Sequence, residues 1–443
     1  MTASSGVPAE TPVVAPAVIN VGLMGLGVVG TGVAATLLRV TAPLSDVTGR
    51  PVRLKKVLVR DFSRPRDIDL PSGLLTTNAE DILADPDIHI LVEVMGGTDP
   101  AEGYLRQGLS AGKHVVTANK EVMAKSGPEL LALARKNGVN LLFEASVGGG
   151  IPIVGCLMNE LAANDIRSIR SIINGTTNYI LTRMAHQGTS FQQALGEAQE
   201  LGYAEADPTN DIEGIDAAYK LTILASLAYR RPFQPSDVYC EGISKLEPQD
   251  FRYAQELGYA IKSLAIANLV DGAVQLRVYP ALVPAEHMLA KVDGVYNAVE
   301  VDGSLCGQVL FHGMGAGREP TTSAVVGDVI EAARKMGGHS PPLEVRKGAD
   351  LAVRPIGDLK VRYYIRLDVA DHPGVLARIA QILGDGEISI AAVLQKDTQP
   401  ETESAEIVIT THSAREASVR KALKAMAGLS QVRRVCNTLR IEE

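Results

Sequence analysis

The stretch VINVGLMGLGVVGTGVAATLL, residues 18–38, decides the fold of the N-terminal part of the chain. Apolar and β-branched residues up to Met24 predict a buried strand, and the apolar run after Gly30 predicts a helix. Between them, Gly25 permits a tight turn, Gly27 lets a ligand approach the backbone, and Gly30 lets helix and strand pack closely. The helix N-terminus offers amide hydrogens to phosphates. The stretch therefore predicts a dinucleotide-binding loop formed by Gly25, Leu26, Gly27, Val28, Val29 and Gly30.

Short apolar strands continue to alternate with helical segments as far as residue 144. Further strands are predicted at residues 54–59, 88–94, 114–117 and 140–144. Such alternation is typical of a parallel, doubly wound sheet, so residues 18–150 are expected to form a Rossmann domain. Residues 1–17, rich in Ala, Pro, Ser and Thr, are expected to be a disordered lead-in.

The middle of the chain mixes helices and strands without that alternation. Helices are predicted at residues 191–201, 212–229 and 248–268, and strands at 274–282 and 308–311. We therefore expect residues 151–313 to form an α+β domain for substrate binding and dimerisation.

The remainder of the chain is expected to hold a returning helix, a linker and a third domain. A helix at residues 323–335, within the segment 314–340, should pack back on the first domain. Pro341, Pro342 and Pro355 mark a linker over 341–361. From residue 362 to 443 the predicted order is strand, helix, strand, strand, helix, strand, which is the ferredoxin-like split βαβ arrangement. The fold class is therefore α/β, with a Rossmann domain, an α+β domain and a C-terminal ferredoxin-like domain.

Composition limits the classes of function. The chain has 443 residues and a formal net charge of -8, so it lacks the basic excess that binds a nucleic-acid backbone. No run approaches the roughly 18 apolar residues that span a bilayer, which argues against membrane insertion. The four cysteines show no paired spacing and are expected to be reduced thiols in a cytoplasmic protein: Cys156, Cys240, Cys306 and Cys436. A small molecule is the expected partner.

The residues after the second predicted strand should decide between NAD and NADP. An acidic residue there would bind the ribose hydroxyls of NAD, whereas an arginine would accommodate the 2′-phosphate of NADP. The sequence is mixed, since Arg60 precedes Asp61, but Arg64 and Arg66 follow. Clustered guanidinium groups favour a phosphate, so NADP is expected with Arg60 as its contact, and NAD is the alternative. A solvated basic loop is the competing interpretation.

Three segments carry polar groups that suit a ligand site. VTANK, residues 116–120, follows a predicted strand and directs Lys120 towards the crevice where such sheets bind ligands. FEASVGGGIP, residues 143–152, combines a carboxylate with unshielded glycine carbonyls, which suits an oxygen-ligated cation, although a hinge that binds nothing looks the same. In the third segment Asp216 and Lys220 stand one helical turn apart. Such a pair is usually a surface ion pair, and only the neighbouring acids and lysines favour a functional one.

Six motifs, in the same order along the chain, resemble those of homoserine dehydrogenases. They are the glycine loop, EVMGGT (93–98), VTANKE (116–121), residues 144–152, NGTTN (174–178) and residues 202–220. The resemblance covers essentially the whole chain. It implies an NAD(P)-dependent oxidoreductase that interconverts L-homoserine and L-aspartate 4-semialdehyde, on the route to threonine, methionine and isoleucine.

The resemblance also implies roles for individual residues. Lys220 would donate a proton to the reacting oxygen, Asp216 would hold that oxygen or orient Lys220, and Lys120 would lie between nicotinamide and substrate. Glu205 would accept the substrate's α-ammonium group. The matching motifs add Thr176 and Tyr203 to the substrate site, and Gly97 and Thr98 to the cofactor site. A monovalent cation, Na⁺ or K⁺, would be held by Glu144, Val147, Gly149 and Ile151.

Residues 371–375 (DHPGV), ahead of an amphipathic helix, resemble the opening of an ACT domain. The resemblance implies that residues 362–443 bind an amino acid between paired copies, with the pathway product threonine as feedback inhibitor. A domain that only assists oligomerisation is the alternative. A homo-oligomer, dimer or tetramer, is expected.

Two other functions fit part of the chain. A semialdehyde dehydrogenase would need an activated cysteine, but Cys156 lies in an apolar context. An amino-acid sensor would not need the set of charged side chains Lys120, Glu205, Asp216 and Lys220.

Overall fold

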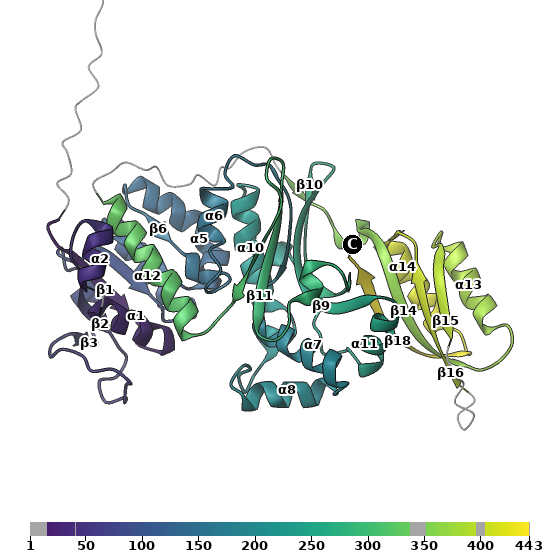
Figure 1. The fold of residues 1–443 in the computed structure, drawn as a ribbon. Helices are drawn as coiled ribbons and strands as arrows, with labels where there is room; N and C mark the ends of the chain where they lie inside the picture. Colours follow the sequence, from purple (N-terminus) through teal and green to yellow (C-terminus); the bar gives the residue numbers. More distant parts are fainter. Residues whose placement is uncertain (1–15, 40, 337–350, 396–403, 443) are drawn as a thin grey trace, which may run out of the picture. The chain divides into compact units, whose positions relative to one another are not determined.

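The computed structural model describes residues 16–39, 41–336, 351–395 and 404–442. The chain forms two compact units (Figure 1). Unit 1 comprises residues 1–150 and 317–345, and unit 2 comprises residues 151–316 and 346–443. Residues 1–15 of the lead-in predicted at 1–17 lie outside the described residues. Among the described residues, no helix is both long and apolar enough to cross a membrane.

Unit 1 contains a six-stranded parallel sheet. Its strands run in the order β3-β2-β1-β4-β5-β6, with β1 at Ile19–Met24, β2 at Val52–Leu58, β3 at Leu75–Thr76, β4 at Ile90–Glu93, β5 at His114–Thr117 and β6 at Leu141–Leu142. This is the Rossmann order, in which successive strands are added on one side up to β3 and on the other side from β4, so the switch point lies between β1 and β4. The predicted Rossmann fold is confirmed. The short strand β3 belongs to this order but was not among the predicted strands.

Helices cover the sheet of unit 1. The helix predicted at 323–335 is α12, Arg318–Lys335, and it packs against α1, Val28–Arg39. Their apolar faces meet in one core that includes Val33, Leu37, Val325 and Val329. The remaining helices of unit 1 are α2 (Thr41–Thr48), α3 (Glu80–Leu83), α4 (Ala101–Ser110) and α5 (Lys120–Lys136).

Unit 2 is built on a single mixed sheet. Nine of its strands follow the order β12-β11-β7-β9-β10-β18-β14-β16-β15. Three short strands pair beside them: β8 (Tyr239–Cys240), β13 (Ala352–Val353) and β17 (Ala414–Arg415). The first part uses β7 (Ile166–Ile172), β9 (Tyr259–Val270), β10 (Ala273–Pro284), β11 (Tyr296–Gly303) and β12 (Gly307–Met314). The C-terminal part uses β14 (Lys360–Ala370), β15 (Ile390–Gln395), β16 (Ser404–Thr411) and β18 (Val432–Ile441).

The two parts of that sheet join where β10 pairs in parallel with β18. Ala281 lies opposite Arg440, and Leu282 lies opposite Ile441. The ferredoxin-like order is confirmed, with α13 at Val375–Asp385 and α14 at Glu416–Ala427. The C-terminal domain therefore shares a sheet with the α+β domain, which the sequence did not predict.

The helix predicted at 248–268 is wrong beyond its first half. Helix α11, Pro248–Glu256, ends before Gly258, which has a φ of +81°. The following residues form β9, which pairs with β10 through a turn at Asp271 (φ +50°) and Gly272 (φ +75°). An Asp-Gly pair with two positive φ values is the type I′ hairpin turn, so a local indicator of the hairpin was present in the sequence.

Other segments complete unit 2. Its helices are α6 (Val154–Met158), α7 (Gly175–Gln187), α8 (Phe191–Glu200), α9 (Thr209–Ile212) and α10 (Ile215–Ala228). Part of the predicted linker over 341–361 is ordered, because Ala352–Val353 forms β13 against β10 and Ile356–Asp358 forms a 3-10 turn. Residues 341–350 of that linker lie outside the described residues.

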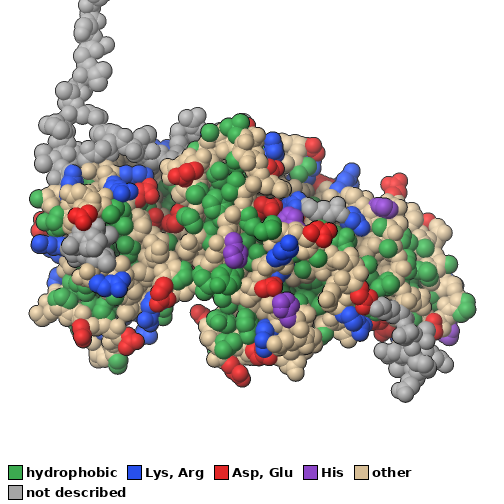
Figure 2. All heavy atoms as spheres, viewed as in Figure 1, with side chains coloured by type: hydrophobic (Ala, Val, Ile, Leu, Met, Phe, Trp, Pro, Cys, Tyr) green, Lys and Arg blue, Asp and Glu red, His purple; other side chains and the backbone are tan. Residues whose placement is uncertain are grey.

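Charge is mixed on the surface. On the face of the described residues shown in Figure 2, basic and acidic side chains alternate without a continuous basic stripe. This mixed surface agrees with the formal net charge of -8.

Candidate active site

The three glycines of the loop have different surroundings. Gly25 has a φ of +100°, and a Cβ there would lie 2.9 Å from the Val94 carbonyl oxygen. A Cβ at Gly30 would lie 2.1 Å from the Gly25 carbonyl oxygen. By contrast, a Cβ at Gly27 would meet no atom within 4 Å. Gly25 and Gly30 are thus required by packing within the chain, whereas Gly27 leaves the space that a dinucleotide pyrophosphate needs.

A hydrogen-bond network joins the carboxyl ends of β4 and β5. The fully buried Glu93 carboxylate accepts from the Met95 backbone N–H at 2.7 Å and from Thr117 Oγ1 at 2.6 Å. The same hydroxyl oxygen accepts from the Asn119 backbone N–H at 3.0 Å. EVMGGT and VTANK therefore meet at the carboxyl edge of the sheet, beside the switch point between β1 and β4. Folds of this kind bind ligands at that edge.

Asn119 connects this network to the next helix. Its Oδ1 accepts from the Val122 backbone N–H at 3.1 Å and caps α5, while its Nδ2 donates to the Gly97 carbonyl at 2.6 Å. Gly97 has a φ of +72° and precedes Thr98. Lys120 is the half-buried first residue of α5. The predicted residues Gly97, Thr98 and Lys120 thus lie at one edge of the sheet, held by Glu93 and Asn119, for which the sequence indicated no role.

Arg60 follows β2 and is exposed. The loop after it is held by hydrogen bonds between its own residues. Asp61 accepts from the Ser63 backbone N–H at 2.8 Å, and this hydrogen bond lowers the pKa of Asp61. Arg66 donates to the carbonyls of Arg64 (2.8 Å), Phe62 (3.2 Å) and Asp61. Arg66 therefore holds the loop together through backbone carbonyls, and Arg60 stays the predicted contact to a 2′-phosphate.

In unit 2, Lys220 and Asp216 form a buried ion pair on α10. Lys220 is 9% exposed and Asp216 3% exposed. Lys220 Nζ donates to Asp216 Oδ2 and to the Ile173 carbonyl, both at 2.7 Å. Asn174 Nδ2 donates to Asp216 Oδ2 at 2.8 Å. The interpretation as an ordinary surface ion pair is therefore wrong for this site.

Asn174 is the residue that sequence reasoning missed at this site. Its Nδ2 also donates to Asp211 Oδ1 at 2.7 Å, and its Oδ1 accepts from the Thr177 backbone N–H at 2.8 Å as the cap of α7. NGTTN supplied the motif, but the long-range partners of its asparagine follow from the fold. The first turn of α7 and the start of α10 are thereby fixed to each other.

Thr176 and Tyr203 lie at the same end of α7. Thr176 Oγ1 donates to the Tyr203 carbonyl at 2.6 Å, and the Tyr203 ring lies 5.1 Å from that of Tyr179. Glu205 follows on the same loop with an exposed side chain. The three predicted substrate residues of unit 2 therefore belong to one surface region that begins at α7.

The segment predicted to bind a cation begins at Glu144. Its backbone N–H donates to Asp328 Oδ2 at 2.9 Å, and burial raises the pKa of Asp328 well above its ordinary value, against the lowering effect of that bond. Gly149 has a φ of +54°, and Val147 lies between it and Glu144. These residues belong to unit 1, whereas Ile151 is the first residue of unit 2. Asp328 is 184 positions from Glu144, so the sequence offered no indication of this contact.

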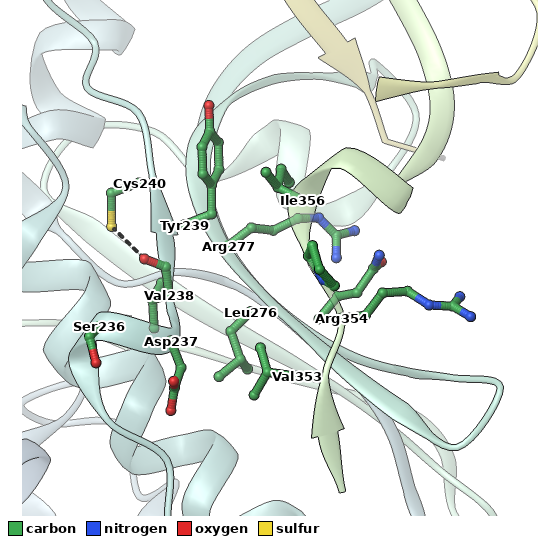
Figure 3. Close-up of a pocket in the computed structure, with 12 residues that line it drawn as sticks. Ser236, Asp237, Val238, Tyr239, Cys240, Leu276, Arg277, Val353, Arg354 and Ile356 are labelled. Atoms are coloured by element: carbon green, nitrogen blue, oxygen red, sulfur yellow. Dashed lines mark hydrogen bonds between the residues drawn. The ribbon is translucent and has the colours of Figure 1, made fainter. Parts of the chain in front are cut away.

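Two cavities of unit 2 lie away from the Lys220 pair. One of about 310 Å³ opens beside β8, Tyr239–Cys240 (Figure 3). Another of about 870 Å³ is lined by residues of β9, β10 and β14. No predicted site residue lines either of them. The candidate site is therefore defined by Lys220, Asp216 and the residues around them, and neither cavity is part of it.

The Rossmann order, the open side of Gly27 and a buried lysine–carboxylate pair define the class of nicotinamide-dependent dehydrogenases with a separate catalytic unit. Three family models match the chain: "Homoserine dehydrogenase, NAD binding domain" over residues 25–144, "Homoserine dehydrogenase" over 152–330 and "ACT domain" over 363–430. The chain belongs to the homoserine dehydrogenase family.

Relatives and solved structures agree with that assignment. Homoserine dehydrogenases of Neisseria gonorrhoeae and Synechocystis are 42% and 43% identical, each over 96% of this chain and 98% and 99% of their own length. The crystal structure of a homoserine dehydrogenase from Thiobacillus denitrificans matches with a TM-score of 0.91 and 44% identity, over 96% of this chain and 98% of that one. A hyperthermophilic archaeal homoserine dehydrogenase in complex with NADPH matches with a TM-score of 0.62 and 27% identity, over 72% of this chain and 98% of that one.

The predicted family and activity are thereby confirmed. The chain is an NAD(P)-dependent oxidoreductase that interconverts L-homoserine and L-aspartate 4-semialdehyde, and its C-terminal domain is an ACT domain. The interpretations as a semialdehyde dehydrogenase or as a sensor without catalysis are not retained.

Proposed function

We propose that Lys220 transfers the proton in this reaction and that Asp216 holds and orients it. The observation that carries the proposal is the buried pair itself, with Nζ 2.7 Å from Asp216 Oδ2. The bound nicotinamide supplies or accepts the hydride. Reduction of the aldehyde leaves negative charge on its oxygen, and a buried ammonium both stabilises that charge and donates the proton. In the direction of homoserine oxidation, the same lysine receives the proton from the hydroxyl.

The other predicted side chains are proposed to bind the substrate and the cofactor. Glu205, with Thr176 and Tyr203 beside it, would receive the α-ammonium group, because an exposed carboxylate selects for that charge. Lys120, at the carboxyl edge of the unit 1 sheet, would contact the nicotinamide. Gly97 and Thr98, together with the glycine loop, would line the rest of the cofactor site.

The central experiment is a spectrophotometric assay of homoserine oxidation with NADP and with NAD, repeated with Lys220→Ala. The wild-type chain should turn over, whereas the variant should lose activity by about 10²-fold or more, as for removal of a general acid–base group. Wild-type activity in the variant would reject the role of Lys220. Absence of turnover in the wild-type chain would reject the activity itself.

NADP is the cofactor that we propose, with Arg60 as the contact to its 2′-phosphate. Arg60 is exposed at the end of β2, where the ribose lies in this fold, and the archaeal relative is a complex with NADPH. Asp61, which would favour NAD, already accepts hydrogen bonds from the backbone and side chain of Ser63.

We also propose a monovalent cation at Glu144, Val147, Gly149 and Ile151. Within the described ranges, no three His, Cys, Asp or Glu side chains group as metal ligands, so backbone carbonyls would supply most of the donor atoms. Activity in sodium, potassium and tetramethylammonium buffers tests this role. Equal rates in all three would reject it.

Threonine is the proposed effector of the ACT domain. Removing the domain is a poor test, because β18 pairs with β10 and its loss would open the sheet of unit 2. His372→Ala in the DHPGV loop is a milder change, since this side chain is exposed. Threonine should inhibit the wild-type enzyme more than this variant. Equal inhibition would favour the alternative, a domain that only assists assembly.

We expect a homo-oligomer, dimer or tetramer, in the cytoplasm. Cys156, Cys240, Cys306 and Cys436 form no disulfide within the part of the chain that the structure describes, as expected for a reducing compartment. Light scattering of the purified enzyme would determine its mass and distinguish the two assemblies.

A further inference from the structure

The segment that leads into α10, residues 212–214, packs against residues 241–244. The Ile243 backbone N–H donates to the Ile212 carbonyl at 2.9 Å, and Ser244 Oγ donates to Glu213 Oε1 at 3.2 Å. A Cβ at Gly242 would lie 2.5 Å from Glu213 Oε2 and 2.7 Å from the Ile212 carbonyl oxygen. Residues 241–244 are therefore in close contact with Ile212 and Glu213, which precede α10.

Asn174 also holds residues 211–216. Asn174 Nδ2 bridges Asp211 Oδ1 at 2.7 Å and Asp216 Oδ2 at 2.8 Å. Between these two carboxylates, Gly214 adopts a φ of +81°, and a Cβ there would lie 3.0 Å from Val278 Cγ1. A displacement of this segment would thus move Asp216 and, through it, Lys220.

The carboxylate of Glu241 is held by the last strand of the ACT domain. Arg440 on β18 donates from Nη1 to Glu241 Oε2 at 2.6 Å and from Nη2 to Glu241 Oε1 at 2.9 Å. Burial works to raise the pKa of Glu241, but the hydrogen bonds from Arg440 outweigh it and hold that pKa below its ordinary value. Tyr239, whose ring rises from β8 in Figure 3, adds a hydrogen bond to the same carboxylate.

Arg440 is itself fixed within the ACT domain. Its Nε and Nη2 donate to Glu416 at 2.9 and 2.6 Å, and its guanidinium lies 4.5 Å from the centre of the Tyr279 ring. A bidentate arginine–carboxylate contact of this kind fixes the orientation of the two groups as well as the distance between them. Arg440 therefore joins Glu416 of the ACT domain to Glu241, and residues 242–244, which follow Glu241 directly, contact Ile212 and Glu213 ahead of Asp216.

We propose that Glu241 is a positioning residue for the reaction: held by Arg440, it fixes residues 212–214 so that Asp216 and Lys220 meet the substrate in the productive geometry. This inference rests on the proposed catalytic role of Lys220. It assigns the ACT domain a part in the geometry of the substrate site, independently of any amino acid that the domain binds.

The chain offers a matched control for Glu241. Glu247 is also a carboxylate held by an arginine of the ACT domain, with Arg366 Nη2 donating to Glu247 Oε2 at 2.6 Å. The exposed fractions of the two glutamate side chains are similar, 35% for Glu241 and 32% for Glu247. Glu247 is the N-cap residue of α11, and within the described residues its carboxylate accepts hydrogen bonds from Arg366 and Arg434 rather than from residues 211–216. Loss of Glu247 should therefore report on stability without moving Asp216.

The test compares Glu241→Gln and Glu247→Gln in the full-length enzyme, with kcat and both KM values measured for homoserine oxidation. Glu241→Gln should lower kcat/KM for homoserine by about tenfold, because a misplacement of about 1 Å can already cost about 10²-fold in rate and the change leaves the hydrogen bonds of residues 243–244 in place. It should leave the KM for NADP within twofold. Glu247→Gln should leave both parameters within twofold. Arg440→Gln should add nothing to the loss caused by Glu241→Gln, since both changes remove the same contact.

Thermal unfolding and circular dichroism establish that each variant is folded at the assay temperature. If Glu241→Gln unfolds, Gly242→Ala tests the same contact, because its Cβ would displace residues 212–213 directly. Equal effects of the Glu241 and Glu247 variants, or an equal rise in the KM for NADP, would overturn the positioning role. Retained activity in Lys220→Ala would instead overturn the catalytic assignment on which the inference rests.

Discussion

Lys220 and Asp216 lie one turn apart on α10 with Nζ 2.7 Å from Oδ2, and the pair is buried beneath the Ile173 carbonyl and the Asn174 amide. In this setting the carboxylate orients the ammonium as well as neutralising it. The ion pair is therefore part of the proposed site, and a substitution of either residue tests it.

Asp216→Asn is expected to lower kcat by about 10²-fold while leaving the protein folded. The amide oxygen can still accept from Lys220 Nζ, but its negative charge is lost. The KM for NADP should change little, since that cofactor binds through unit 1. Steady-state kinetics with a thermal melt measure both effects. A kcat within twofold of the wild-type value would show that the carboxylate is structural.

The glycine loop gives a prediction that separates stability from binding. Gly27→Ala should leave the unfolding midpoint unchanged, because its Cβ would meet no atom within 4 Å. Its affinity for NADPH should fall, since the methyl group would occupy the space of the pyrophosphate. Gly30→Ala should destabilise unit 1 by about 1–3 kcal/mol, because its Cβ would lie 2.1 Å from the Gly25 carbonyl oxygen.

Thermal melts and fluorescence titration with NADPH distinguish the two glycine variants. Similar losses of stability in both would contradict the different surroundings of Gly27 and Gly30. Unchanged NADPH affinity in Gly27→Ala would remove the loop from the cofactor site.

The strands of unit 1 were predictable because each parallel strand is buried on both faces and forms a short apolar run. The same reasoning failed for residues 259–270, whose apolar and small residues also suit a helical periodicity. Gly258 and the Asp271-Gly272 turn carried the missing information, since positive φ values end a helix and close a hairpin. The joining of β10 to β18 had no comparable local indicator.

For the candidate site, the sequence supplied a hypothesis for the reacting groups but no indication of the residues that hold them. Asp216 and Lys220 are four residues apart, so helical geometry alone brings them together. Asn174 lies 42 positions from Asp216, and Arg440 lies 199 positions from Glu241. Contacts over such separations depend on strand order and register. Local patterns do not specify either of these.

Arg60→Ala is expected to raise the KM for NADPH by about tenfold, the effect of losing one charge-assisted hydrogen bond, and to leave that for NADH unchanged. Arg66→Ala is the contrasting variant. Its side chain braces the loop through backbone carbonyls, so its loss should weaken both cofactors to a similar degree. Kinetics with each cofactor measure the preference. An unchanged ratio of the two KM values in Arg60→Ala would assign Arg60 to a solvated loop.

His114 predicts a pH dependence of stability. Burial, with a smaller contribution from His89, lowers its pKa from 6.5 to about 4. Its Nδ1 accepts from the Asn140 backbone N–H at 3.2 Å, which requires an unprotonated nitrogen. The unfolded chain therefore binds a proton that the folded chain excludes, so stability is present above pH 6.5 and declines as the pH falls towards 4.

The decline should be on the order of 1 kcal/mol per pH unit between those values. Denaturation at several pH values measures it, and His114→Gln should flatten the dependence because an amide does not titrate in this range. The same slope in both proteins would assign the effect to other groups. His89, whose pKa is also lowered by burial, is the first of these.

Arg366 is expected to be the most costly arginine of the ACT domain to replace. Its side chain is 1% exposed and donates to Asp250 at 2.8 Å, to Glu406 at 2.9 Å and to Glu247 at 2.6 Å. Arg366→Met should lower the free energy of unfolding by about 3–5 kcal/mol, because Asp250 would stay buried without its counter-charge. Arg252, 58% exposed and 3.9 Å from Glu406, provides the control.

Arg252→Met should change the unfolding free energy by less than about 0.5 kcal/mol, as exposed substitutions usually do. Adding Asp250→Asn to Arg366→Met should recover part of the loss, because the unpaired charge is then removed together with its partner. Urea denaturation of the four proteins measures these terms. If Arg366→Met were no more destabilising than Arg252→Met, this charge network would not hold the ACT domain on α11, and the attachment would rest on the shared apolar core and on the pairing of β10 with β18.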